Sequence, residues 1–87
     1  MLKFSLGKVV ITTGAMEVLD QGKIQDLIWR HANLDFGDTP PQDVQMNMEA
    51  IETKDRIMSS YKIGKEKIWV ITDAGHEVTT ILLPEEY

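Results

Sequence analysis

The sequence predicts an α+β domain in which a small, mostly antiparallel sheet of four strands packs with about three helices, in the order β-α-α-α-β-β-β. Residues 56–84 form three runs of alternating side chains joined by two tight connections, as antiparallel strands do. Residues 8–12 are compact and β-branched, which favours a further strand. Between these segments, apolar residues recur at helical spacing.

Chain length and composition indicate one domain, residues 1–87, because 87 residues leave no room for two independent cores. The chain has no cysteine, which excludes a disulfide framework and a thiolate zinc site. The apolar run 9–11 is too short for a signal sequence or a membrane span. We therefore expect a soluble protein that stays in the cytoplasm.

The first two helices are expected at about residues 15–20 and at residues 23–32. In the first, Met16 and Leu19 should face inward, and Gly22 should end the helix because glycine readily takes the left-handed conformation. In the second, four residues share one face at i, i+3, i+4 and i+7. They are Ile24, Leu27, Ile28 and His31.

The third helix is expected to run from a capping sequence to about residue 53, after a loop in which Phe36 is an apolar plug. Thr39 would be the N-cap, and Pro40 would stand at the first helical position, where its missing N–H is no loss. The inward stripe would contain Val44, Met48, Ile51 and the polar Asn47.

Both faces of the predicted sheet carry apolar side chains. Met58, Trp69 and Ile81, with Thr79, are candidates for one face, and an apolar patch there would mark an interface. The pattern indicates that this second face is covered, by a partner protein or by a second copy of the chain in a homodimer.

Polar side chains on inward positions form a second candidate site. His31 and Asn47 lie on the inward stripes of their helices, and Ser59 and Tyr61 share a face of the adjoining strand. Buried polar groups need partners. We expect a hydrogen-bonded network between helices and sheet, which is either a structural device or the floor of a small ligand pocket.

No pattern points to catalysis. His31, Asp35 and Asp38 do not have the spacing of a zinc, calcium or iron site, and Ser59 has no positioned base in the sequence. No glycine-rich phosphate loop is present. We expect no enzymatic activity, no cofactor and no metal.

Charge is distributed unevenly along the chain. The net charge of −5 argues against direct nucleic-acid binding, which needs a basic surface. Residues 31–53 have no lysine or arginine, and residues 54–67 are basic. The acidic segment is either a solvated face or a binding surface for a basic partner. Its carboxylates are Asp35, Asp38, Asp43, Glu49 and Glu52.

The chain resembles, over almost its whole length, a family of short bacterial proteins found on plasmids and integrative conjugative elements. The matching pieces are residues 7–10, Thr12, 14–17, 30–31, 37–38, Asp43, Asn47, Ala50, 56–61, 69–72 and the tail 79–87. The family usually has Gly-Asp-Trp-Gly-Asp where this chain has residues 34–38, and often a proline at the place of Thr13.

Family members are commonly called hypothetical or plasmid-related, and some carry the name of a type I restriction subunit. The resemblance implies a mobile genetic element. It leads us to expect a protein-binding accessory factor of the anti-restriction or anti-CRISPR type, whose partner is a basic, nucleic-acid-binding defence protein. The alternative is a small-ligand-binding protein, or a weak enzyme, with a pocket near His31 and Asn47.

Overall fold

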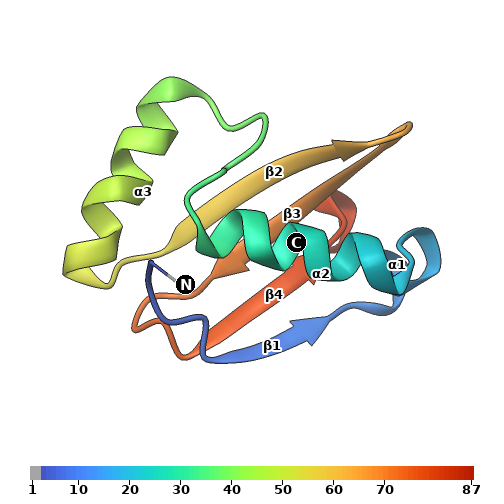
Figure 1. Cartoon of the computed structure of the whole chain (residues 1–87), viewed down its shortest axis with the longest axis horizontal. Helices are drawn as coiled ribbons and strands as arrows, with labels where there is room; N and C mark the ends of the chain where they lie inside the picture. The colour runs from blue at the N-terminus through green and yellow to red at the C-terminus, as the bar shows by residue number, and fades with distance from the viewer. Residues whose placement is uncertain (1–2) are drawn as a thin grey trace.

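A computed structural model describes residues 3–87 and confirms the α+β fold, with the predicted order of elements (Figure 1). No helix within these residues is both long enough and apolar enough to cross a membrane. The elements are β1 (Lys8–Ile11), α1 (Thr13–Val18), α2 (Gln21–Ala32), α3 (Pro41–Thr53), β2 (Ile57–Ile63), β3 (Glu66–Thr72), β4 (Val78–Leu82) and the 3-10 helix η1 (Pro84–Glu86).

The strands form one sheet in the order β1-β4-β3-β2. The two short connections make β2, β3 and β4 antiparallel neighbours, as the alternation predicts. β1 adds to the outer side of β4 and runs parallel to it, with Lys8 opposite Val78. The parallel pairing follows from the helices between β1 and β2, which bring the chain back so that β2 runs in the same direction as β1. The two antiparallel connections that follow then give β4 this direction as well.

The first two helices begin at side-chain caps. Thr12 Oγ1 accepts from the backbone N–H of Ala15 (3.2 Å), and Asp20 Oδ1 accepts from that of Lys23 (2.8 Å). α1 ends because Leu19 takes an extended conformation, so the expectation that Gly22 ends it is wrong, and Gly22 lies within α2. Met16 is 60% exposed rather than inward, and Ala15 is buried in its place.

α3 begins one residue later than the sequence predicts. Pro41 stands at the first helical position and Pro40 at the N-cap, so Thr39 cannot cap the helix. The Thr39 hydroxyl instead donates to the carbonyl of Phe36 (2.7 Å), which closes the preceding turn. Met48 lies on the outer face, 46% exposed, and Ala50 is buried instead.

α1 and α2 cover one face of the sheet (Figure 1). The side chains beneath them are fully or almost fully buried, and Leu27 of α2 packs into the same core. From the strands these side chains are Tyr61, Ile68, Val70 and Ile81. A second cluster around Phe36, which is 4% exposed and acts as the predicted plug, joins Phe4, Ala50 and Ile57 beside α3.

Ile81 and Thr79 do not share a face with Met58 and Trp69, so that part of the predicted second-face patch is wrong. Ile81 lies opposite Val70 in the ladder, and both point to the helices. Met58 lies opposite Ile71, and both point to the other face with Trp69. Alternation fixes the two faces within each strand, but the relative parity of two strands depends on the register of their turn.

The second face is covered in part by the chain's own last residues. The ring of Tyr87 packs edge-on against Trp69, with centroids 5.6 Å apart. Arg56 Nη1 donates a hydrogen bond to the Tyr87 hydroxyl (2.6 Å). The C-terminal Tyr87 therefore has a role within the molecule, in covering this face of the sheet.

Glu86 fastens the tail to the first helix. Its Oε1 accepts from the Thr12 hydroxyl (2.6 Å) and from the backbone N–H of Leu83 (2.8 Å), and Oε2 accepts from that of Gly14 (3.1 Å). A Cβ at position 14 would lie 2.5 Å from this carboxylate, so a larger residue there would push the Glu86 side chain aside. The hydrogen bond from Thr12 holds the pKa of Glu86 below its usual value.

We expect Glu86→Ala to lower the melting temperature and to speed amide exchange in α1, because three donors lose their acceptor. The stabilisation is present above the usual pKa of the carboxyl and is lost as pH falls through the lowered folded-state pKa. Glu85→Ala is the matched control, since Glu85 is its exposed neighbour. Equal melting temperatures for the two variants would contradict the fastening role.

Candidate functional site

A continuous hydrogen-bond network runs from α2 through the sheet to the N-terminal segment. His31 Nδ1 is 2.5 Å from Ser59 Oγ on β2, and His31 Nε2 is 2.9 Å from Thr72 Oγ1 on β3. Thr72 Oγ1 lies 2.8 Å from Thr79 Oγ1 on β4, which donates to the carbonyl of Leu6 (2.7 Å). The four side chains are completely buried.

The donor and the acceptor of each hydrogen bond in this network can be assigned. A carbonyl only accepts, so Thr79 donates its single hydroxyl proton to Leu6. Thr72 must then donate to Thr79, which leaves the Thr72 oxygen to accept from His31 Nε2. The neutral imidazole therefore carries its proton on Nε2 and accepts at Nδ1 from Ser59.

The surroundings of His31 keep the imidazole neutral. The rings of Phe4 and Phe36 approach it edge-on, with centroids 5.4 and 6.4 Å away. Burial lowers the pKa of His31 to about 4, because the charged form would lose its hydration. The imidazole is thus a hydrogen-bonding element of the core at neutral pH.

The Ser59–His31 pair has the contacts of a nucleophile and its base, yet it lacks access. In a catalytic pair the base activates a hydroxyl that reaches the substrate. Here both side chains have zero exposure, and neither borders the larger cavity described below. The two side chains are hydrogen-bond partners within the core.

Asp35 anchors the loop before α3. Arg30 donates to both of its carboxylate oxygens, from Nε (2.8 Å) and from Nη2 (3.4 Å), and stacks over the ring of Tyr61 at 4.7 Å. The Tyr61 hydroxyl donates to the backbone carbonyl of Asp35 (2.7 Å). Hydrogen bonding to Arg30 lowers the pKa of Asp35, and burial raises that of Tyr61. The negative charge of Asp35 is therefore balanced by Arg30 within the molecule.

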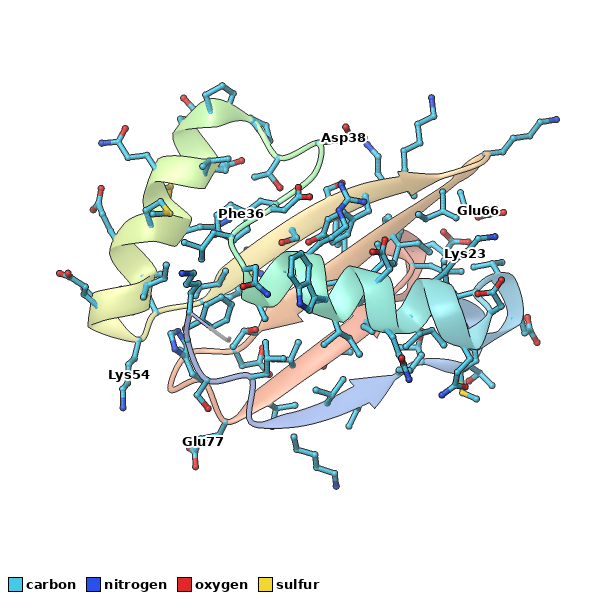
Figure 2. All side chains as sticks on the ribbon, in the orientation of Figure 1. Lys23, Phe36, Asp38, Lys54, Glu66 and Glu77 are labelled. Carbon is cyan, nitrogen blue, oxygen red and sulfur yellow. The ribbon has the colours of Figure 1, made fainter. Side chains whose placement is uncertain are left out.

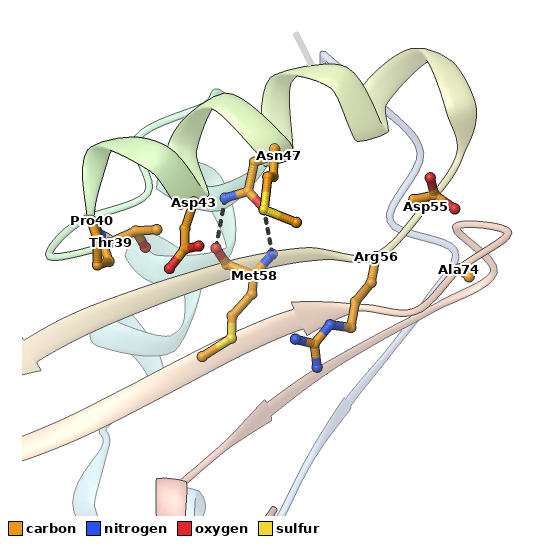
Figure 3. A pocket seen from close by; sticks show the side chains of 9 residues that line it. Thr39, Pro40, Asp43, Asn47, Asp55, Arg56, Met58 and Ala74 are labelled. Atoms are coloured by element: carbon orange, nitrogen blue, oxygen red, sulfur yellow. Dashed lines mark hydrogen bonds between the residues drawn. The ribbon is translucent and has the colours of Figure 1, made fainter.

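Asn47 belongs to a different contact from His31. From α3, its Nδ2 donates to the carbonyl of Met58 (2.8 Å), and its Oδ1 accepts from the Met58 N–H (3.1 Å), as dashed in Figure 3. One side-chain amide thus pairs with the outer edge of β2 as a neighbouring strand would. Two residues further along, the Ser60 N–H donates to Phe36, and the Ser60 carbonyl accepts from Asp38 (2.6 Å).

A cavity of about 490 Å³ lies between α3 and the outer part of β2 (Figure 3). Its lining mixes apolar, acidic and basic side chains. The residues are Thr39, Pro40, Asp43, Met46, Asn47, Asp55, Arg56, Met58 and Ala74. Among these residues, the large apolar side chain of Met46 is 66% exposed. A smaller cavity of about 200 Å³ lies on the second sheet face next to Tyr87.

The predicted acidic residues do not share one location. Asp43 lines the cavity, whereas Asp35 pairs with Arg30. Asp38 lies in the loop before α3 (Figure 2). Glu49 and Glu52 are exposed on α3, and helical spacing turns both away from the inward-facing Asn47. Of the predicted polar residues, Asn47 reaches the cavity, and His31, Ser59 and Tyr61 do not.

Sequence reasoning did not single out Asp55, Arg56 or Met46 as site residues. Asp55 and Arg56 lie in the connection that follows α3, and only the fold brings them to the same cavity as Thr39, Pro40 and Asp43 from the start of that helix. Met46 could have been found, because it is an apolar residue outside the predicted inward stripe. Thr72 and Thr79 lie on the same faces of their strands as the apolar core residues Val70 and Ile81. This alternation could have predicted that their hydroxyls are buried.

Within residues 3–87, no group of three or more histidine, aspartate and glutamate side chains is placed to hold a metal ion. Comparisons with protein-family models, with curated proteins and with solved structures find no match to this chain.

Proposed function

We propose that this protein is a non-enzymatic protein-binding module that works through the cavity between α3 and β2. The observation that carries the proposal is the exposed Met46, which lines the cavity together with Met58. Methionine side chains are flexible and polarizable, and they occur on surfaces that adapt to partner proteins. Asp43 and Asp55 add negative charge at the same cavity.

The resemblance to proteins of mobile genetic elements supports a partner in host defence. Restriction and CRISPR effector proteins bind nucleic acids through basic surfaces, and an acidic protein of net charge −5 is attracted to such a surface. The proposed accessory factor binds the basic surface of a defence protein.

The test is binding of the purified protein to a panel of restriction and CRISPR effector proteins by biolayer interferometry. We expect one stable complex, with affinity falling roughly tenfold or more between about 50 and about 300 mM salt because screening weakens charge attraction. Met46→Glu should abolish the complex, because it puts a charge where apolar contact is made. Glu49→Gln, on the outer face of α3, is the control. A complex indifferent to Met46→Glu would contradict the proposal.

The cavity also favours a second candidate, a small-ligand-binding protein. Its volume falls within the roughly 300–1,000 Å³ typical of ligand pockets. A small molecule that raises the melting temperature of the wild type, and not that of Met46→Glu, would favour this function.

A further inference from the structure

The two ends of the cavity between α3 and β2 carry carboxylates. Asp43 lies in the first turn of α3, and Asp55 follows the last turn, so about 15 Å of helix separates them. Figure 3 shows them on opposite sides of Met58 and Asn47. Across residues 3–87, ion pairs join Lys23 to Asp20 and Arg30 to Asp35, and neither of the two cavity carboxylates takes part in one.

The positive charges nearby are directed elsewhere. Among the residues that line the cavity, Arg56 is the cation, and its guanidinium donates to the Tyr87 hydroxyl and lies 5.7 Å from the centre of that ring. Lys54, at the far end of α3, points away from the molecule in Figure 2. The cavity thus presents acid at each end.

Apolar side chains also line the cavity. They are Met46 of α3, Met58 of β2, Pro40 and Ala74, and Figure 3 shows Met58 between Asp43 and Asp55. The amide of Asn47 is already paired with the Met58 backbone, so it offers less hydrogen bonding to a ligand. An occupant therefore needs an apolar group at its centre and a cation at each end.

We propose that this cavity binds an extended basic peptide segment of the partner, with one apolar side chain between the two methionines and a lysine or arginine near each of Asp43 and Asp55. This inference rests on the proposed protein-binding function and adds the chemistry of the bound segment. An extended chain advances about 3.3 Å per residue, so cations four or five residues apart span the two carboxylates.

The experiment titrates the ¹⁵N-labelled full chain with the peptide acetyl-Gly-Lys-Ala-Leu-Ala-Lys-Gly-amide and follows backbone amide shifts. We expect the shifts to gather at Met46, Met58 and Ala74. Asp43→Asn and Asp55→Asn should each weaken binding by about fivefold, the upper range for an exposed ion pair. Glu49→Gln should leave the affinity unchanged.

The isomer acetyl-Gly-Ala-Lys-Lys-Leu-Ala-Gly-amide has the same composition, but its adjacent lysines point to opposite sides of an extended chain and are not spaced along it toward the two ends of the cavity. We expect it to bind about fivefold more weakly and to be sensitive to only one of the two aspartate substitutions. Equal affinity for the two peptides, an equal loss in Glu49→Gln, or shifts away from the cavity would overturn the proposal.

Two results separate this proposal from the proposed function. If Met46→Glu abolishes the complex with a partner protein while the two peptides bind alike, the ligand chemistry is wrong and the protein-binding function stands. If the peptides differ as expected and no defence protein binds, the cavity chemistry is right and the partner class is wrong.

Discussion

Lowering the pH from about 7.5 to about 5 should reduce the free energy of unfolding by about 2 kcal/mol through His31 alone. Burial lowers the folded-state pKa of His31 to about 4, below its ordinary value of 6.5. The unfolded chain therefore binds a proton in this window and the folded chain does not. Stability is fully present above the ordinary pKa and is lost as the pH falls toward the folded value.

Urea unfolding of the wild type and of His31→Gln at both pH values measures this contribution. Glutamine has a donor and an acceptor, as the imidazole does, but it does not titrate. The variant should therefore lose less free energy of unfolding on acidification, and it should be less stable than the wild type at pH 7.5. The two proteins differ only at residue 31, so the difference between their pH dependences measures the contribution of His31. If acidification destabilises both proteins equally, His31 is not the titrating group.

Gly37→Ala should destabilise the protein by about 3 kcal/mol, from left-handed strain and from the loss of two strand-edge hydrogen bonds. Gly37 has a φ of +64°, and a Cβ there would lie 2.3 Å from the carbonyl oxygen of Ser60. The loop must then move away from β2. The bonds at risk run from the Ser60 N–H to Phe36 and from the Asp38 N–H to Ser60.

Gly64→Ala is the matched control. Gly64 has nearly the same φ, +61°, in the β2–β3 turn, and a Cβ there would meet nothing within 4 Å. We expect it to lose about 1 kcal/mol, the strain alone. Chemical denaturation of both variants gives the difference, and equal losses would show that the contact with Ser60 has no energetic weight.

The sequence was sufficient for the fold because its signals are local. Alternation marks β2, β3 and β4, and the spacing of Leu27 and His31 marks α2. The errors arose where two local signals compete. Consecutive prolines at 40 and 41 offer two starts for α3, and Asp20 caps α2 ahead of the glycine that was expected to end α1.

The sites were harder to predict because they depend on distances between elements. Inward positions for His31 and Asn47 follow from helical periodicity, but their assignment to separate contacts depends on how α2 and α3 cross the sheet. Asp35 and Asp43 look alike in the sequence. In the structure Asp35 pairs with Arg30 and Asp43 lines the cavity. Neither of these locations can be recognised from the spacing of residues in the sequence.

The amide of Asn47 and the loop at Gly37 bear on how this molecule can self-associate. They occupy the outward backbone groups of Met58 and Ser60, so a second chain cannot extend the sheet beside the middle of β2. The opposite border of the sheet is β1, four residues long. Strand exchange or fibril growth would therefore begin beside β1, where the short ladder limits its length, and Asn47→Leu would open a second route.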